Sequence, residues 1–205
     1  AYHLFAREDE DARDEWEEEL ADMIDYLKFF PSIAIWCPFN EGWGQFDSVR
    51  IAESIRAQDP TRLIDAASGW FDQGDFISVH NYFRRLKVAA GEWKKHKKSR
   101  AFFLSEYGGF AFHIDGHSSV ERIFGYKRYE TKEEFSKAYD DLIQKALLPL
   151  REQGLSGAVY TQVSDIEEEV NGILTYDRKV VKLNLPETSE ESRSKEESSE
   201  SQPSE

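Results

Sequence analysis

Two glutamates stand at the ends of short apolar runs, in a setting that suits chemistry on sugars. Glu41 follows the run 33–37 and Glu106 ends the run 101–106, and two glycines and an aromatic residue come directly after each glutamate. Paired carboxylates that flank a glycosidic bond are what most glycoside-cleaving enzymes require. Glycines let the backbone approach a ligand, and an aromatic ring offers an apolar face to a pyranose. A strand that ends in a solvated turn has a similar composition, so one such segment alone leaves both interpretations open.

The elements that carry these glutamates are predicted to be parallel β-strands. The apolar runs are too short for helices, and prolines or glycines bound them. Two strand-terminal glutamates converge only if their strands are parallel and end at the same edge of a sheet. The α/β barrel has this geometry, because its chemistry lies at the carboxyl ends of its strands. The fold class is therefore predicted to be α/β.

Alternating strands and helices fill most of the chain. Strands are predicted at residues 33–37, 63–67, 76–80, 102–106 and 157–162. Helices are predicted at residues 9–30, from Asp47 as N-cap to the stop at Asp59–Pro60, at 86–98, and from Thr131 to about 153, where Glu134 completes a capping box. The long connection 110–129 carries several aromatic and histidine residues beside Glu106, and we interpret it as a substrate-side loop. A loop that packs its own aromatics is the alternative.

The order of the motifs resembles the catalytic barrel of glycoside hydrolase family 2, which includes β-galactosidases, β-glucuronidases and β-mannosidases. The resemblance covers roughly residues 10–182. It rests on five segments in order: Ser32–Trp36 with Phe39–Gly44; Ser68-Gly69-Trp70 with His80-Asn81-Tyr82; Ser105–Gly109; Tyr160–Asp165; and Asn171–Arg178.

The resemblance implies a retaining double displacement with no cofactor. It makes Glu41 the general acid/base and Glu106 the nucleophile, and the carboxyls of such a pair lie roughly 5–5.5 Å apart. Asn40 is the expected donor to the sugar 2-hydroxyl, and Tyr82 is expected to hydrogen-bond Glu106. The remaining candidate substrate-binding residues are His80, Trp43, Trp70 and Gln162. For His80, Trp43 and Trp70, a packed strand-end residue is an equally good interpretation. Gln162 stands near the position where the family often has a tryptophan.

Five strands fall short of the eight that a closed barrel requires. By resemblance they are the fourth to eighth strands, so we expect residues 1–185 to be the C-terminal part of a TIM-barrel catalytic domain. The partners expected are the N-terminal domains of the same parent enzyme and a β-linked glycoside, and an oligomer is open. Residues 186–205 are rich in Ser and Glu and contain no large apolar residue. Such a tail is predicted to be disordered.

Composition narrows the remaining partners. The net charge is −14, which argues against nucleic acid and anionic membrane surfaces. No apolar run is long enough to span a bilayer, and we see no signal peptide, so the expected location is the cytoplasm. The only cysteine, Cys37, lies in an apolar run and is expected to be a small core residue.

No metal site is predicted. His113 and His117 are four residues apart but fall in a loop with Gly116, so the helical zinc-site argument does not apply. The acidic group formed by Asp165 and residues 167–169 leaves room for a structural cation, although a solvated loop explains it equally simply.

Two hypotheses of function follow. The first is a retaining β-glycosidase region, β-galactosidase-like because Asn171-Gly172-Ile173 lacks the lysine of the Asn-x-Lys motif of family glucuronidases. The second is a catalytically incompetent barrel fragment that binds carbohydrate or another protein. Both glutamates, Asn40 and Tyr82 favour the first for the parent protein, and the missing strands favour the second for this chain alone.

Overall fold

The structure of the protein is a computed structural model, and it describes residues 6–69, 74–82 and 100–184. Three predictions lie outside these ranges: the substrate-binding role of Trp70, the helix at 86–98 and the disordered tail at 186–205. None of the described helices is long and apolar enough to cross a membrane.

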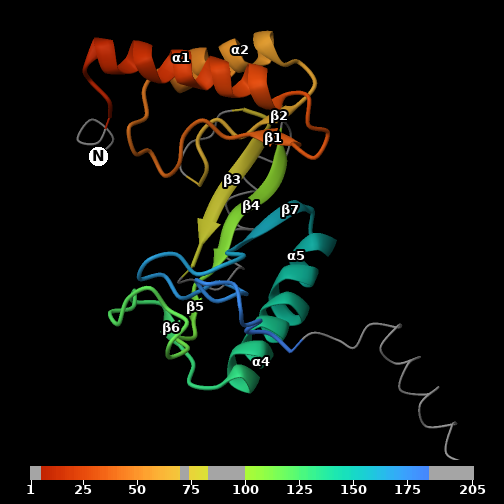
Figure 1. Cartoon of the computed structure of the whole chain (residues 1–205). Helices are drawn as coiled ribbons and strands as arrows, with labels where there is room; N and C mark the ends of the chain where they lie inside the picture. Colours follow the sequence, from red (N-terminus) through yellow and green to blue (C-terminus); the bar gives the residue numbers. More distant parts are fainter. Residues whose placement is uncertain (1–5, 70–73, 83–99, 185–205) are drawn as a thin grey trace, which may run out of the picture.

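In the described chain, helices and strands alternate as far as β2, and the strands β2 to β6 then precede the helices α4 and α5 and the last strand, β7 (Figure 1). The helices are α1 (Glu10–Leu27), α2 (Ser48–Gln58), α4 (Lys132–Leu142) and α5 (Leu148–Glu152). The strands are β1 (Ile35–Trp36), β2 (Leu63–Ile64), β3 (Phe76–Asn81), β4 (Ala101–Gly108), β5 (Phe110–Ala111), β6 (Lys127–Arg128) and β7 (Leu155–Thr161). Each of the five predicted strand segments contains a strand, and the long connection after β4 also forms the small β5–β6 pair.

All strand ladders in the described residues are parallel. The order β3-β4-β7 forms one sheet, and β1 pairs with β2 in a second. Two single bridges lie beyond β1 and β2: Asn40 pairs with Ser68 in parallel, and Asp65 pairs in antiparallel orientation with Gly74, which precedes β3. Because parallel strands end at a common edge, the residues that follow β1, β3 and β4 are brought to the same side. The described strands form an open α/β arrangement with no closed barrel.

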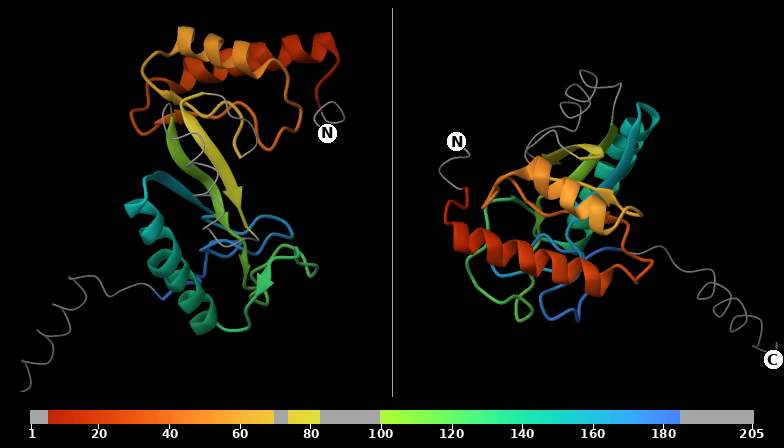
Figure 2. Two further views of the ribbon diagram at one scale, coloured as in Figure 1. Left: turned by 180° about the vertical axis from the view of Figure 1, so that it is seen from behind. Right: turned by 90° about the horizontal axis from the view of Figure 1, so that it is seen from above.

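Two of the four hydrophobic cores in the described residues hold the strands that carry the glutamates. The first, here called the α1–α2 core, packs α1 and α2 against β1 and β2 through residues such as Ile24, Ile51, Ile55 and Ile64, each nearly inaccessible to solvent. The second, the β4–α5 core, joins β3, β4 and β7 to the helical segment 142–150 around Phe102 and Leu104, which are buried, and includes Leu150 and Leu155. Figure 2 shows α1 and α2 covering one end of the sheet while α4 and α5 run along its β7 side.

Several local predictions are corrected by the packing. Helix α2 buries Ile51, Ala52 and Ile55, whereas Val49 is 51% exposed. Asp47 is the N-cap of α2, but its side chain makes no capping hydrogen bond and instead lies 3.5 Å from Arg50. Its backbone is left-handed (φ 38°) rather than extended, so the carboxylate is not directed at the first free amides of the helix.

The predicted long helix after Thr131 is interrupted. Thr131 caps α4 as predicted, since its hydroxyl accepts from the Glu134 amide at 3.2 Å. A π-helical turn, Ile143–Leu147, separates α4 from α5. Pro149 lies just beyond this turn and has no amide hydrogen to continue the α-helical pattern, which accounts for the local change.

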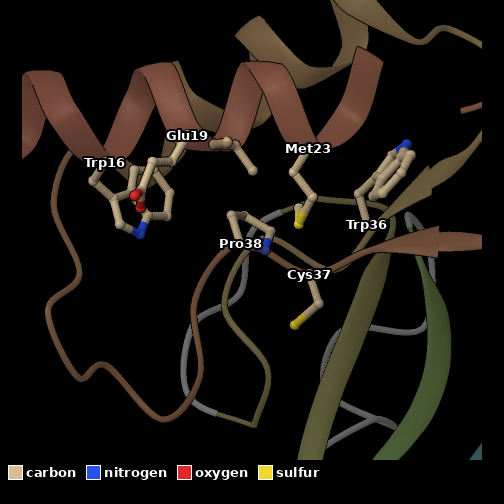
Figure 3. Close-up of a pocket in the computed structure, with 7 residues that line it drawn as sticks. Trp16, Glu19, Met23, Trp36, Cys37 and Pro38 are labelled. Carbon is tan, nitrogen blue, oxygen red and sulfur yellow. The ribbon is translucent and has the colours of Figure 1, made fainter. Parts of the chain in front are cut away.

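Cys37 lies at the surface and not in a core. It is exposed and lines a cavity of about 270 Å³ between α1 and β1 (Figure 3). The figure shows Trp16 and Met23 descending from α1 toward Pro38. Strand β1 has only β2 as a ladder neighbour among the described strands, so nothing described covers the other edge. Met23, which lines the same cavity, is 43% exposed.

A buried ion pair stabilises the segment that follows β7 and connects it to the loop after β4. The ammonium of Lys182 donates to a carboxylate oxygen of Asp165 at 2.7 Å and to the carbonyls of Phe112 and Val170 at 2.9 Å each. The Lys182 and Asp165 side chains are 0% and 1% exposed. The acidic group considered above as a cation site therefore has a lysine ammonium at Asp165, and Lys182 ties this segment to the connection after β4.

Removal of this ammonium should destabilise the fold strongly. In Lys182→Met, the Asp165 carboxylate and two buried carbonyls lose their donor, and we expect the free energy of unfolding in urea to fall by roughly 3–5 kcal/mol. Lys179→Met removes an exposed partner of Asp177 at 3.7 Å and should cost about 1 kcal/mol or less. Equal losses in the two variants would contradict a dominant role for the buried pair.

Candidate active site

The loop that carries Glu41 is fixed from both sides. The Glu41 amide donates to the Ser68 carbonyl at 3.1 Å, which extends the β1–β2 pairing to the strand ends. On the helix side, Trp16 of α1 stacks on Phe39 with ring centroids 4.8 Å apart. Glu41 itself has a left-handed backbone (φ 53°). This conformation is costly for a residue with a side chain, and such residues cluster at functional sites.

Glu106 occupies the central strand of its sheet. Strand β4 has β3 on one side and β7 on the other, and His80 of β3 is the direct register partner of Glu106. The alternation along β4 directs Phe102 and Leu104 into the core. Glu106 remains partly accessible, with 26% of its side chain exposed. The strand that carries Glu106 thus has a paired strand on each side.

His80 brings the two glutamates together. Its Nδ1 lies 2.8 Å from Glu41 Oε1 and 3.3 Å from Glu106 Oε2. A carboxylate oxygen of each glutamate and a ring nitrogen of His80 all lie within 4.8 Å of one another. The predicted convergence of the two strand-terminal glutamates is therefore present in the structure. Among the described residues, these three side chains also lie close enough together to bind a metal ion. Two of them are the carboxylates to which the family resemblance assigns catalysis.

The surroundings of His80 determine where its proton lies. Nδ1 faces oxygens of Glu41 and Glu106, and the ionised carboxylate of Glu106 can only accept, so Nδ1 carries the proton and donates. Nε2 lies 2.7 Å from Ser68 Oγ, and in the neutral ring it accepts from that hydroxyl. Gly69 packs flat against the ring, since a Cβ on this glycine would fall 2.3 Å from the His80 ring carbons. The imidazole is thereby held on both edges and on one face.

Tyr82 contacts the other carboxylate. Its hydroxyl donates to Glu106 Oε2, as predicted, and also lies 3.0 Å from Thr161 Oγ1 at the end of β7. Burial, together with the bond to Glu106, raises the pKa of Tyr82 far above its ordinary value. The phenol therefore stays protonated across the working range of an enzyme and always has a proton to offer Glu106.

A buried polar layer lies beneath the carboxylates. Ser78 Oγ is 2.8 Å from Asp65 Oδ2 and 2.6 Å from Ser105 Oγ, and it accepts from the Gly69 amide at 3.0 Å. Asp65 is 2% exposed, and burial raises the pKa of its carboxyl. This layer joins β2, β3 and β4 at the level just below His80. It fixes the relative height of the strand ends that carry the site.

The other predicted residues differ in their surroundings. Asn40 is exposed beside Glu41, and Trp43 is 61% exposed in the same loop. Gln162 uses its amide nitrogen to donate to the Asn171 side chain at 3.0 Å. Of the two loop histidines, His113 lies 3.3 Å from Asp115 and His117 lies 2.9 Å from Asp177, so they have separate partners.

Sequence reasoning assigned no role to Ser68, Thr161 or Asp65. Ser68 and Thr161 each stand at the end of a predicted strand, so their position could have indicated that they face the same edge as the glutamates. Their partners could not be inferred, because Ser68 bonds a residue 12 positions away and Thr161 a residue 79 positions away. Asp65 lies inside an apolar run. A single carboxylate there indicates that it forms a buried polar contact, but the sequence does not identify the partner.

Comparison with known protein families identifies the family of this chain. The family model described as "Glycosyl hydrolases family 2, TIM barrel domain" matches residues 2–188. The chain belongs to glycosyl hydrolase family 2. The resemblance of its motifs to this family is thus confirmed. A comparison with curated proteins finds no match.

Solved structures support the family 2 fold. A putative β-galactosidase from Bacteroides fragilis superposes with a TM-score of 0.57 at 17% identity, over 82% of this chain and 29% of that one. The Parabacteroides merdae β-glucuronidase with glycerol in its active site gives 0.57 at 15% identity, over 84% and 26%. A β-glucuronidase from an uncultured Clostridium gives 0.51 at 14% identity, over 82% and 35%. The family 2 chain thus spans about a third or less of these proteins, and at such identities the likeness establishes the fold alone.

Gly69→Ala should displace the His80 ring. The new Cβ would enter the ring position, and the backbone (φ +75°) also disfavours a side chain. Gly116→Ala is a matched control, because that glycine has a similar backbone (φ +76°) with no atom within 4 Å of the added carbon. We expect Gly116→Ala to cost about 1–2 kcal/mol in urea unfolding, and Gly69→Ala to cost about 1–3 kcal/mol more.

NMR spectroscopy of the His80 ring tests the same prediction in a second way. In ¹⁵N NMR spectra, the His80 ring resonances should move in Gly69→Ala and stay unchanged in Gly116→Ala. Unchanged His80 resonances in both variants would show that the glycine does not determine the ring position.

Proposed function

We propose that this domain provides the catalytic pair of a retaining β-glycosidase that works by double displacement. The observation that carries the proposal is the convergence of Glu41 and Glu106 on His80, with oxygens of the two carboxylates within 4.8 Å of each other. Retaining enzymes hold their carboxyls about 5–5.5 Å apart, whereas inverting enzymes leave roughly 6.5–9.5 Å for a water molecule. The spacing therefore favours retention.

In the first step, Glu106 attacks the anomeric carbon. The bond between that carbon and the leaving oxygen breaks, and Glu41 gives its proton to this oxygen. In the second step, Glu41 takes a proton from a water molecule, which attacks the same carbon and releases Glu106. Tyr82 supports this division of roles, because its hydroxyl donates to Glu106 and so stabilises the ionised, attacking form.

The neighbouring residues supply substrate contacts in this proposal. Asn40 stands beside Glu41 and binds the 2-hydroxyl, a contact that strengthens in the transition state. Trp43, with most of its surface exposed, offers a stacking face to a sugar ring. His80 keeps the two carboxylates together, and its burial under both of them makes it a weaker candidate for direct sugar contact.

The glycone is proposed to be uncharged, as in a β-galactoside. The segment that corresponds to the glucuronidase Asn-x-Lys motif reads Asn171-Gly172-Ile173, without the lysine. Asn171 is 0% exposed, and its amide donates to the Thr161 carbonyl at 3.1 Å. Neither feature offers a partner to a sugar carboxylate. Two of the three similar structures described above are β-glucuronidases, so this point needs direct measurement.

Activity is proposed to require strands beyond the described ones. Strand β1 carries the acid/base loop but has only β2 as a ladder neighbour among the described strands, and catalysis tolerates little misplacement. The uncovered edge beside the α1–β1 cavity favours association or poor solubility. This open edge also supports the second candidate, a module that binds carbohydrate or another protein without turning it over.

A panel of nitrophenyl β-glycosides separates the two candidates. A longer form with the complete barrel is expected to cleave the β-galactoside faster than the β-glucuronide, with retained anomeric configuration by NMR. Residues 1–205 alone are expected to show no turnover. An inverted product would contradict the mechanism, and a monodisperse, cooperatively melting 205-residue monomer that cleaves the panel would contradict the need for further strands.

Chemical rescue assigns the nucleophile. Glu106→Gly in the active form should abolish turnover, because no group is left to attack the anomeric carbon. Added azide should restore cleavage of activated aryl β-glycosides and give the α-azide, since azide enters from the side that Glu106 vacates. Recovery of the β-azide would instead make Glu41 the nucleophile and reverse the assignment.

Substrates with different leaving groups test whether Glu41 is the general acid. In Glu41→Ala, substrates with poor leaving groups should slow far more than dinitrophenyl glycosides, by roughly 10²–10⁴-fold, because activated leaving groups need little proton donation. Glu53→Ala, an exposed residue on α2, is the control and should leave both substrate classes unchanged. Equal losses for both classes in Glu41→Ala would mean that Glu41 has a structural role.

A further inference from the structure

One hydroxyl group connects all three strands of the β3-β4-β7 sheet. Tyr82 directly follows β3, its hydroxyl bonds Glu106 on the central strand β4, and the same oxygen lies 3.0 Å from Thr161 Oγ1 at the end of β7. Tyr82 therefore reaches across the central strand. The Tyr82 hydroxyl is the point at which β7 touches the nucleophile.

The number of available protons determines which group donates in the contact between Tyr82 and Thr161. A tyrosine hydroxyl has a single proton, and an ionised carboxylate has none. The Tyr82 proton therefore goes to Glu106, and across the 3.0 Å contact the Thr161 hydroxyl is the donor and the Tyr82 oxygen the acceptor. The influence of Thr161 on the pKa of Tyr82 agrees with this direction: burial and Glu106 raise that pKa, whereas the bond to Thr161 lowers it.

The Thr161 hydroxyl is well placed for this task because its backbone is fixed. The Thr161 carbonyl accepts from the Asn171 amide at 3.1 Å, and Asn171 is fully buried. The Asn171 oxygen in turn accepts from Gln162 at 3.0 Å. On the other side, Thr161 is the register partner of Gly108 on β4. The segment after β7 thus holds the threonine against the sheet.

We propose that Thr161 is a positioning residue for the nucleophile, whose hydroxyl directs the only proton of Tyr82 toward Glu106. Without that donor, the Tyr82 hydroxyl is free to rotate toward other acceptors. With it, the two hydrogen bonds run in one direction and each polarises the other. The inference rests on the proposed function, in which Glu106 attacks the anomeric carbon, and it assigns β7 a role in that step.

The experiment compares Thr161→Val, which removes the hydroxyl at nearly constant volume, with Thr161→Ser, which keeps it. In the active form of the enzyme, formation of the glycosyl-enzyme from a 2-fluoroglycoside is followed by intact mass. Thr161→Val should form it about five- to tenfold more slowly, with little change in KM, and Thr161→Ser should stay within about twofold of the parent.

A double-mutant cycle separates a relay from a general packing effect. Tyr82→Phe removes the phenol oxygen through which Thr161 is proposed to act. In that background, Thr161→Val should cause no further loss. A full additional loss would overturn the relay, as would a Thr161→Val enzyme with the parent rate or a Thr161→Ser enzyme as slow as Thr161→Val.

A spectroscopic measurement keeps this test independent of turnover. With ¹³Cζ-labelled tyrosine, the Tyr82 resonance, assigned from Tyr82→Phe, should shift in Thr161→Val and not in Thr161→Ser. If the parent forms no glycosyl-enzyme, the proposed function fails while this resonance still decides whether Thr161 donates to Tyr82. An unchanged Tyr82 resonance in Thr161→Val overturns the inference in either case.

Discussion

The site depends on one constraint, which is that parallel strands end at the same edge of a sheet. Glu41 and Glu106 are far apart in the sequence, and the strands that carry them pack in different hydrophobic cores. They meet because the carboxyl-terminal parts of β3 and β4 and the loop after β1 lie on one side. The short apolar runs, the αL turn at Glu41 and the helices on the outside all serve this placement. If one strand were reversed, its glutamate would lie at the opposite end of the molecule.

Side-chain hydrogen bonds then convert approximate proximity into a defined geometry. His80 contacts both carboxylates, Ser68 and Gly69 hold His80, and Tyr82 holds Glu106 from the other side. The polar layer around Ser78 lies below them and joins three strands. Buried polar networks of this kind are costly when a member is unsatisfied, so they specify one arrangement of the strands strongly.

The sequence predicted the parts of this site that local patterns encode. Apolar runs located the strands, and the position of each glutamate at a strand end indicated the shared edge. Local patterns were less reliable where residues distant in the sequence determine whether a side chain is buried and what it contacts. Cys37 was expected in a core because it lies in an apolar run, but it is exposed and lines the cavity between α1 and β1. Lys182 gave no signal, because its acceptors at Asp165, Phe112 and Val170 are 12 to 70 residues away.

The two hydrophobic cores have a consequence for how the site responds to motion. Glu41 is carried by the α1–α2 core and Glu106 by the β4–α5 core, while His80, Ser68 and the Asp65–Ser78 contact cross between them. The distance between the two glutamates is thus set by contacts that join these two cores. A rotation of one core relative to the other by a few degrees would change the gap between the glutamates while leaving each core intact. Mutations on the outer faces of α1 or α5 that shift one core against the other are therefore expected to change this gap without touching either glutamate.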